Sequence, residues 1–360
     1  MISSSAGILS RRVTGGERLS AATVAMADSC GLVDDVLAQP GHFRDALNRL
    51  DRLELAPHDR PGGLLVCGMG GSAIGADLAQ AAIGDRARRP MRTLRDYAPA
   101  PWLTPDTLVV CASYSGNTEE TLAAYAAAGA TGAERVAITT GGALADAAYA
   151  DGVPVIAVPA GLQPRAAVAY MTAAVLECAY RCGAAPPTRA EVVAAIDLLE
   201  DLAAEWGPEA PDDSEAKALA IALHGVVPVV YGAGSTAAVA RRWKAQINEN
   251  AKAPAFHAEL PEADHNEICA WERAQGRFAG VMLDTGDLPE RMERRLELTA
   301  GLVAAAGAPM RRVRARGRGS LEHVLSLVFL GDLVSIYLAA LDGIDPTPVE
   351  QIERFKRALG

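Results

Sequence analysis

The chain has 360 residues, of which 50% are hydrophobic and 22% are charged, and its formal net charge at pH 7 is −10. This length and composition are sufficient for two domains with buried cores. The negative charge argues against a nucleic-acid partner, because binding a phosphate backbone requires a basic surface. The most apolar stretch, residues 325–341, contains Asp332. We therefore expect a buried helix there and no membrane partner.

The cysteines and the first residues indicate a cytoplasmic location. The six cysteines are scattered and lack the spacing of metal ligands. The first residues include Arg11 and Arg12 but lack the apolar segment of a secretory signal. Reduced thiols in a cytoplasmic protein are the expected state.

Short apolar runs alternate with alanine-rich, helical segments from about residue 63 onward. This alternation is typical of a parallel sheet wrapped by helices. The predicted strands are residues 64–67, 91–94, 108–112, 135–139 and 153–158. A long helix over about residues 165–182 follows, and the Gly- and Pro-containing segment 183–188 is a predicted linker.

The same alternation restarts after the linker. Helices are predicted near residues 189–204, 214–224 and 236–248, and strands near residues 226–231, 255–259, 278–283 and 310–313. The glycine turn at residues 232–236 matches the turn at residues 68–72 in its position after a strand. We therefore predict an α/β fold of two doubly wound units, residues 1–183 and 184–360, each a parallel sheet flanked by helices, with C-terminal helices after the second.

Two short loops of the first half have the composition of an anion site. Residues 68–72 (Gly-Met-Gly-Gly-Ser) follow the first predicted strand, and residues 113–118 (Ser-Tyr-Ser-Gly-Asn-Thr) follow the third. Each opens a helix, where free backbone N–H groups and the helix dipole favour a phosphate. Glycine permits close approach, and hydroxyls add donors. The candidate phosphate ligands are Gly71, Ser72, Ser113, Ser115 and Thr118.

The loops differ from the common nucleotide-binding motifs. A Walker loop requires a lysine after its last glycine, and none follows Gly70 or Gly71. A dinucleotide fingerprint requires a third glycine, but Ala73 occupies that position. Tight turns and helix caps would explain either loop alone. The pair together favours a small phosphorylated ligand.

Three further candidate residues lie in segments that are rich in charged and polar side chains. Arg165 follows the last strand of the first predicted sheet, near the carboxyl edge where doubly wound folds bind ligands. Glu249 lies in the polar end of the helix that begins near residue 236, and His265 lies in an acidic segment at the start of a helix predicted to run to residue 271. Taken singly, Arg165 and Glu249 are also compatible with ordinary surface charges. The acidic residues around His265 suggest a metal site, but the H-E-x-x-H pattern is absent, so we predict no metal.

Six segments together resemble the bifunctional phosphoglucose/phosphomannose isomerase family, whose members contain two sugar-isomerase (SIS) domains. The segments occur in the family's order and extend from about residue 60 to the end, with Ala76 where relatives often have a second glycine. They are GMGGSAIGADL (68–78), SYSGNTEETL (113–122), QPRAA (163–167), WKAQINENAK (243–252), HNEI (265–268) and DPTPVEQIERFK (345–356).

The resemblance implies an aldose–ketose isomerase that interconverts glucose 6-phosphate or mannose 6-phosphate with fructose 6-phosphate through a cis-enediol. It implies Glu249 as the base and Arg165 as the cation that stabilises the intermediate. His265 would open the sugar ring, assisted by Lys356. It further implies no cofactor and a homodimer with shared active sites, because the family's histidine reaches into the neighbouring subunit.

Two alternatives stay open. A non-catalytic SIS regulator would keep the hydroxyl-rich loops but would need none of Glu249, His265 and Lys356. An isomerase of another sugar phosphate would keep all of them.

Overall fold

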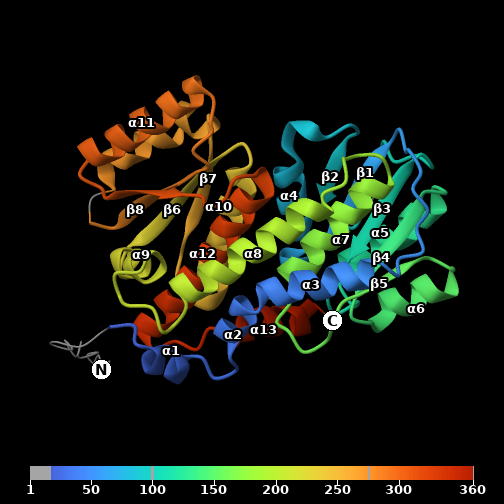
Figure 1. The fold of residues 1–360 in the computed structure, drawn as a ribbon, viewed down its shortest axis with the longest axis horizontal. Coiled ribbons are helices and arrows are strands. Elements are labelled where there is room, and N and C mark those ends of the chain that lie inside the picture. The colour runs from blue at the N-terminus through green and yellow to red at the C-terminus, as the bar shows by residue number, and fades with distance from the viewer. Residues whose placement is uncertain (1–17, 99–100, 275, 360) are drawn as a thin grey trace, which may run out of the picture.

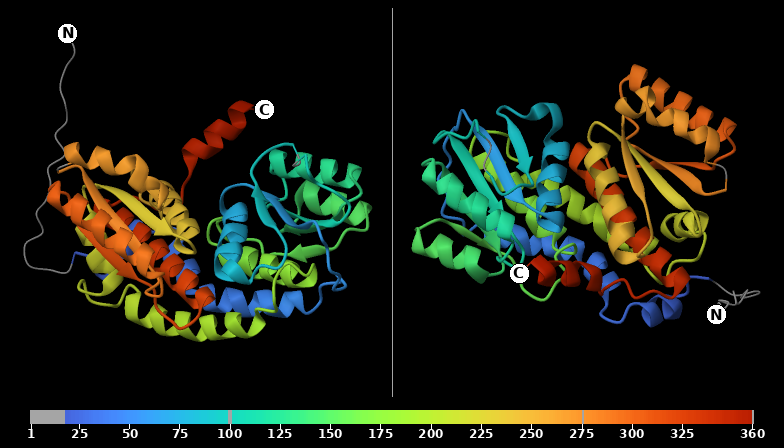
Figure 2. Two further views of the ribbon diagram at one scale, coloured as in Figure 1. Left: turned by 90° about the horizontal axis from the view of Figure 1, so that it is seen from above. Right: turned by 180° about the vertical axis from the view of Figure 1, so that it is seen from behind.

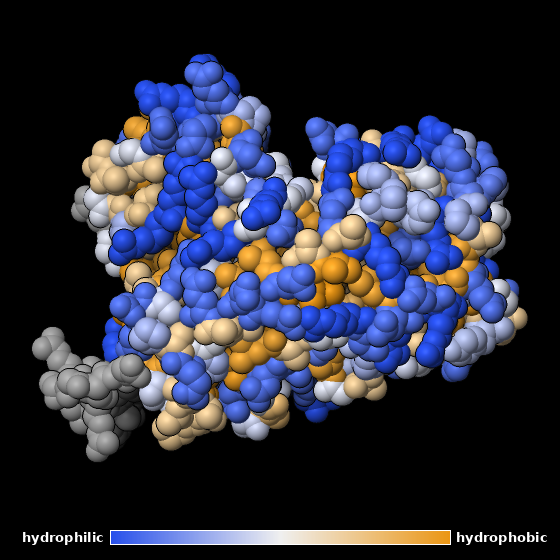
Figure 3. All heavy atoms as spheres, in the orientation of Figure 1, coloured by the Kyte–Doolittle hydropathy of each residue, from blue (hydrophilic) through white to orange (hydrophobic). Residues whose placement is uncertain are grey.

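The computed structural model describes residues 18–98, 101–274 and 276–359 (Figure 1). Residues 1–17, which bear on the expectation about a secretory signal, lie outside the described residues. Two parallel sheets form separate lobes, and long helices run between them (Figure 1). The space-filling view shows a notch between the two lobes at the top of this face (Figure 3).

The first sheet has five parallel strands in the order β2-β1-β3-β4-β5. They are β1 (Gly63–Gly68), β2 (Met91–Leu94), β3 (Thr107–Ala112), β4 (Glu134–Thr139) and β5 (Val155–Ala157). All residues of β1 and β3 are buried, as expected for central strands with helices on both faces. The five strands predicted from the apolar runs are therefore confirmed, with small shifts at their ends.

The helices of the first half of the chain flank this sheet, apart from the first two, which pack against the later helix α12 (Ser320–Asp342). They are α1 (Ala21–Ala27), α2 (Leu32–Leu37), α3 (Gln39–Leu50), α4 (Gly70–Ile83), the short 3₁₀ helix η1 (Gly84–Arg86), α5 (Glu119–Ala130), α6 (Gly142–Ala150) and α7 (Val168–Arg181). Helix α4 packs against α7, and α3 packs against both α7 and α8 (Arg189–Trp206).

The second sheet has four parallel strands in the order β7-β6-β8-β9. They are β6 (Val227–Ala233), β7 (Phe256–Leu260), β8 (Phe278–Asp284) and β9 (Met310–Arg314). In both sheets the second strand along the chain lies on one side of the first, and the third and fourth follow on the other side. This common order supports the predicted duplication. The division of the chain at residue 183 stays a prediction.

The remaining helices belong to the second half. They are α9 (Glu215–Leu223), α10 (Thr236–Asn250), the 3₁₀ helices η2 (Glu262–His265) and η3 (Glu267–Arg273), α11 (Glu290–Ala305), α12 (Ser320–Asp342) and α13 (Glu350–Leu359). Helix α13 projects away from the two lobes (Figure 2), and none of its residues is buried.

Helix α12 is the central core helix and packs against α8, α9 and α10. It is long and apolar enough to cross a membrane, but 94% of its apolar window is buried inside the fold. The side chain of Glu322 caps its start by accepting from the N–H of Gly319 at 2.9 Å. The chain leaves the helix at Gly343, which has a left-handed φ of +64°. The predicted buried helix at residues 325–341 is therefore confirmed.

An ion pair in the middle of this core joins three helices. Asp332 of α12 and Arg242 of α10 are almost fully buried, and the guanidinium contacts the carboxylate at 2.9 and 2.7 Å. The amide of Gln39 in α3 donates to the same carboxylate at 2.9 Å. Such a pair is tolerated in a core when nearly all its donors and acceptors are matched.

Replacing Asp332 should therefore destabilise the protein strongly. We expect Asp332→Ala to lower the free energy of unfolding by about 3–5 kcal/mol, because Arg242 would stay buried without its counter-ion. Urea unfolding followed by circular dichroism measures the change. As a control, Glu297→Ala breaks an exposed pair with Arg294 and should cost no more than about 1 kcal/mol. Equal unfolding midpoints for the two variants would contradict this account.

Candidate active site

The two predicted phosphate loops lie side by side. They follow β1 and β3, which are neighbours in the sheet with Gly68 opposite Ala112. The hydroxyl oxygen of Ser72 accepts a hydrogen bond from the backbone N–H of Tyr114 at 3.1 Å. The structure therefore joins the two loops at the carboxyl edge of the first sheet.

The first loop is shorter than the sequence suggested. Strand β1 ends at Gly68 and α4 begins at Gly70, so that Gly71 and Ser72 belong to the first helical turn. Gly70 has φ +49°, which favours glycine and allows this abrupt change of direction. The first N–H groups of a helix have no acceptor within it, so the physical reason for an anion site here is unchanged.

The second loop is held by its own hydroxyls. The Ser113 hydroxyl is buried, lies 2.8 Å from the Thr118 hydroxyl and accepts from the N–H of Gly116 at 3.1 Å. Ser115 is exposed, and its hydroxyl accepts from the N–H of Asn117 at 3.3 Å. Glycine is required at position 116, where φ is +71° and a Cβ atom would lie 1.7 Å from a neighbouring carbonyl oxygen.

The backbone of Arg165 packs against the first loop at Gly71. Arg165 occupies the turn before α7, and its side chain is only 4% exposed. A Cβ atom at Gly71 would lie 2.8 Å from the carbonyl oxygen of Pro164 and 3.1 Å from Cα of Arg165. Since Gly71 follows the end of β1, Arg165 is at the carboxyl edge of the sheet, as expected.

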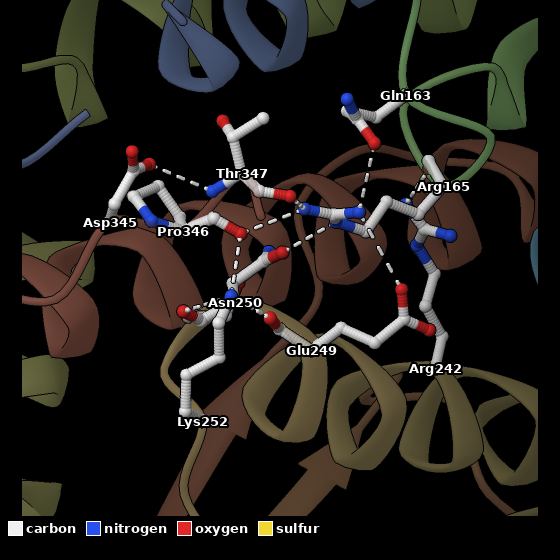
Figure 4. Close-up of polar contacts among 10 residues, drawn as sticks. Gln163, Arg165, Arg242, Glu249, Asn250, Lys252, Asp345, Pro346 and Thr347 are labelled. Carbon is white, nitrogen blue, oxygen red and sulfur yellow. Dashed lines mark hydrogen bonds and ion pairs between the residues drawn. The ribbon is translucent and has the colours of Figure 1, made fainter. Parts of the chain in front are cut away.

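Arg165 and Glu249 point toward each other from opposite halves of the chain (Figure 4). Nη1 of Arg165 lies 3.7 Å from Oε2 of Glu249, which comes from the last turn of α10 and is 30% exposed. Burial lowers the pKa of the Arg165 guanidinium, and the Glu249 carboxylate opposes that shift. An arginine still keeps its proton near neutral pH. The arrangement therefore combines a carboxylate with a fixed positive charge.

The C-terminal DPTPV segment packs against the same arginine. Nη2 of Arg165 donates to the carbonyl oxygens of Pro346 and Thr347 at 2.8 and 3.0 Å, and Nε donates to Oδ1 of Asn250 at 2.7 Å. The motif at residues 345–349 therefore contributes main-chain carbonyl groups that hold the arginine.

Lys252 is a contact residue that the sequence analysis did not single out. It has a left-handed φ of +54°, and its ammonium donates to the carbonyl oxygens of Glu249 at 2.6 Å and of Pro346 at 3.0 Å. Partial burial and the nearby charge of Arg165 lower the pKa of Lys252. A lysine just after a polar helix end is a recognisable signal, because cations bind the free carbonyl groups there.

A cavity of about 610 Å³ adjoins Glu249. It lies between the end of α10 and the start of α13, and its lining is Asn248, Glu249, Lys252 and residues 348–352. This volume falls in the range of small-ligand sites. The hydroxyl-rich loops are not among the residues that line it.

His265 and Lys356 make no direct polar contact with the other catalytic candidates in the part of the chain that the structure describes. Both are exposed, and within the described part of the chain no hydrogen bond or ion pair joins either one to Arg165 or Glu249. Lys356 is one helical turn beyond Ile352, which lines the cavity. Among the described residues, no group of three or more His, Cys, Asp and Glu side chains could hold a metal ion.

The segment around His265 differs from the predicted continuous helix. It forms the 3₁₀ helices η2 and η3 instead. Asn266 separates them with φ −149° and ψ −64°, and its side chain accepts from the N–H of Glu267 at 2.6 Å. Asparagine competes for backbone groups in this way, which interrupts helices.

Comparison with known proteins defines the class first. The family described as "Bacterial phospho-glucose isomerase C-terminal SIS domain" matches residues 212–359. The solved structure of tagatose-6-phosphate ketose/aldose isomerase from Escherichia coli has the same fold, with a TM-score of 0.64 at 16% identity over 87% of this chain and 93% of that one. The chain is therefore an α/β protein of the SIS class.

Two curated relatives identify the family within this class. The bifunctional phosphoglucose/phosphomannose isomerase of Caldicellulosiruptor bescii is 39% identical over 301 residues, which cover 82% of this chain and 89% of that protein. The protein of the same description from Aquifex aeolicus is 37% identical over 302 residues, covering 82% and 90%. The chain belongs to the bifunctional phosphoglucose/phosphomannose isomerase family.

The close packing of Gly71 against Arg165 predicts that adding one methyl group at position 71 lowers stability and weakens phosphate binding. Gly71→Ala should cost about 1–3 kcal/mol of stability, because the new Cβ atom meets backbone atoms that cannot simply rotate away. It should also weaken the binding of inorganic phosphate by displacing the first turn of α4. Urea unfolding and isothermal titration calorimetry measure the two effects.

The matched control is Gly301→Ala in α11, where a Cβ atom would meet nothing within 4 Å. That variant should be unchanged or more stable by up to about 1 kcal/mol. If Gly71→Ala behaves like Gly301→Ala in both measurements, the close approach is not required.

Proposed function

We propose that this protein is a metal-independent aldose–ketose isomerase that interconverts glucose 6-phosphate and mannose 6-phosphate with fructose 6-phosphate. The observation that carries the proposal is the pairing of Arg165 Nη1 with the Glu249 carboxylate at 3.7 Å, beside a ligand-sized cavity. The names of the relatives in the family support the same substrates.

The chemistry requires one base and one fixed positive charge. Isomerisation removes the proton at C2 of the open-chain sugar and returns it at C1 through a cis-enediol. Glu249 takes and returns this proton, and a positioned base contributes on the order of 10²–10⁴ in rate. Arg165 stabilises the negative oxygen of the intermediate, because its guanidinium remains protonated. With that charge supplied by arginine, the reaction needs no metal ion.

The hydroxyl-rich loops bind the phosphate group. The first N–H groups of α4, with the Gly71 backbone and a set of side-chain hydroxyls, provide donors for its oxygens. Holding the phosphate fixes the far end of the open chain and orients the reacting carbons. The proposed hydroxyl ligands are Ser72, Ser113, Ser115 and Thr118.

His265 and Lys356 open the sugar ring in our proposal. Moving a proton between the ring oxygen and O1 near neutral pH suits an imidazole. Because His265 is exposed and makes no contact with Glu249 within the described residues of its own chain, we place it in the active site of a second copy. The protein would then be a homodimer with shared active sites.

Helix α13 supports the dimer. Its ten residues include no buried side chain, and Ile352, Phe355 and Leu359 are 40%, 65% and 65% exposed on one side of the helix. A helix of this length gains little stability in water without packing. A second copy would cover this apolar face.

All six cysteines are free, which agrees with a cytoplasmic enzyme.

The proposal is tested with EDTA-treated protein supplied with glucose 6-phosphate or mannose 6-phosphate and monitored for fructose 6-phosphate. Turnover of both substrates is the expected result. Binding of either sugar phosphate without turnover would instead favour the regulator. Turnover of only another sugar phosphate in a substrate panel would favour a different isomerase.

Removing the base should separate catalysis from binding. We expect Glu249→Gln to reduce kcat by at least about 10²-fold, while the affinity for the sugar phosphate stays nearly unchanged. Glu350→Gln is the matched control, because Glu350 lines the same cavity but has no ion pair with Arg165. Retained turnover in Glu249→Gln, or an equal loss in Glu350→Gln, would remove Glu249 as the base.

If the active sites are shared between subunits, mixing two inactive variants should restore part of the isomerase activity. Glu249→Gln and His265→Ala should each be inactive alone. After mixing and subunit exchange, mixed dimers contain one site with both residues intact, so about one quarter of wild-type activity should return. Analytical ultracentrifugation verifies the dimer. A fully active monomer, or no recovery from mixed dimers, would contradict shared sites.

A further inference from the structure

The buried guanidinium of Arg165 has only one nitrogen available for a substrate. An arginine carries five N–H donors in a fixed plane. Nε is occupied by Asn250, and both hydrogens of Nη2 have acceptors in the carbonyl groups of Pro346 and Thr347. Nη1 makes only long contacts, 3.4 Å to Gln163 and 3.7 Å to Glu249 (Figure 4). The side that faces Glu249 is therefore the reactive edge.

The orientation of the Asn250 amide determines which side of the Arg165 guanidinium stays free. Asn250 is fully buried, and its Nδ2 donates to the hydroxyl of Ser335 at 2.8 Å. That hydroxyl in turn donates to the carbonyl oxygen of Asp332 at 2.6 Å. Ser335 is therefore an acceptor toward Asn250, which directs the amide oxygen at Nε of Arg165. A reversed amide would place two donors against each other at Nε.

The main chain of Arg165 is held by the same part of α12. Nη2 of Arg242 donates to the carbonyl oxygen of Arg165 at 3.0 Å and to the Asp332 carboxylate at 2.7 Å. Asp332 thus anchors the arginine twice. Its carboxylate holds Arg242, and its main-chain oxygen holds Ser335. Both paths are almost completely shielded from water.

We propose that Asn250 and Ser335 are positioning residues that direct Nη1 of Arg165 toward the oxygen on which charge develops. This role rests on the proposed isomerase function, in which Arg165 stabilises the enediolate. Asn250 acts by fixing Nε, and Ser335 acts by fixing the amide of Asn250. Neither residue touches the substrate in this arrangement, and their effect passes entirely through the guanidinium.

The first test separates kcat from KM. Asn250→Ala should lower kcat roughly 10- to 100-fold with little change in KM, because small displacements of a catalytic group have costs of this size. Ser335→Ala should lower kcat by about 2- to 10-fold, as expected for one neutral hydrogen bond. The control is Ser326→Ala, another buried serine of α12, whose hydroxyl bonds instead to Arg316 and His323. It should keep wild-type kcat.

The second test uses binding, which a purely structural role would affect uniformly. A hydroxamate analogue of the enediolate carries negative charge at the position that Arg165 faces. Glucitol 6-phosphate, an open-chain sugar alcohol, lacks that charge. In Asn250→Ala we expect the Kd of the hydroxamate to rise about 10- to 100-fold while the Kd of glucitol 6-phosphate stays within about threefold.

The outcomes distinguish this inference from the proposed function. If wild-type protein turns over neither hexose phosphate, the proposed function fails. If wild-type protein is active and Asn250→Ala keeps its kcat and its hydroxamate affinity, the positioning role alone is wrong. If both ligands weaken equally, or Ser326→Ala loses as much kcat as Ser335→Ala, the residues only stabilise the fold, and the inference is also overturned.

Discussion

A buried guanidinium requires acceptors for its N–H groups, and at Arg165 these acceptors come from distant parts of the chain. Asn250 at the end of α10 and the carbonyl groups of Pro346 and Thr347 surround it. An unpaired charge in this position would be costly, so the segments must close around it together. The hydrogen bonds of this one side chain thus link the end of α10 and the C-terminal segment to the edge of the first sheet.

The duplicated fold uses equivalent helices in different ways. Helix α4 follows the first strand of the first sheet, and α10 follows the first strand of the second. In the first half, the N-terminal turn of α4 offers free N–H groups suited to an anion. In the second half, the opposite end of α10 carries Glu249 and the capping ammonium of Lys252. These two ends belong to one region of the molecule, because Arg165 packs against Gly71 in the first turn of α4 and its guanidinium lies 3.7 Å from Glu249 at the end of α10.

Local patterns were sufficient for most elements of the fold. Within the described residues, the sequence predicted each of the nine strands of the two sheets. The central strands β1 and β3 are buried throughout and consist mainly of apolar residues, whereas the edge strand β9 contains three arginines and is largely exposed. Helix starts were less predictable. Residues 70–72 are helical although two of them are glycines, because Gly70, with a φ of +49°, turns the chain directly from β1 into α4. The expected helix around His265 became two 3₁₀ helices because the side chain of Asn266 captures a backbone N–H.

The sequence by itself determined the fold class, the two hydroxyl-rich loops and the family, because each depends on local periodicity or on contiguous motifs. It also contained Arg165 and Glu249, each in its own motif. Only the tertiary structure decided that they approach within 3.7 Å and that Asp332 anchors the arginine through α12. It also showed that, among the described residues, no hydrogen bond or ion pair joins His265 to either of them. The first two relations join residues far apart in the chain, and the packing of α10 and α12, rather than any local pattern, brings them together.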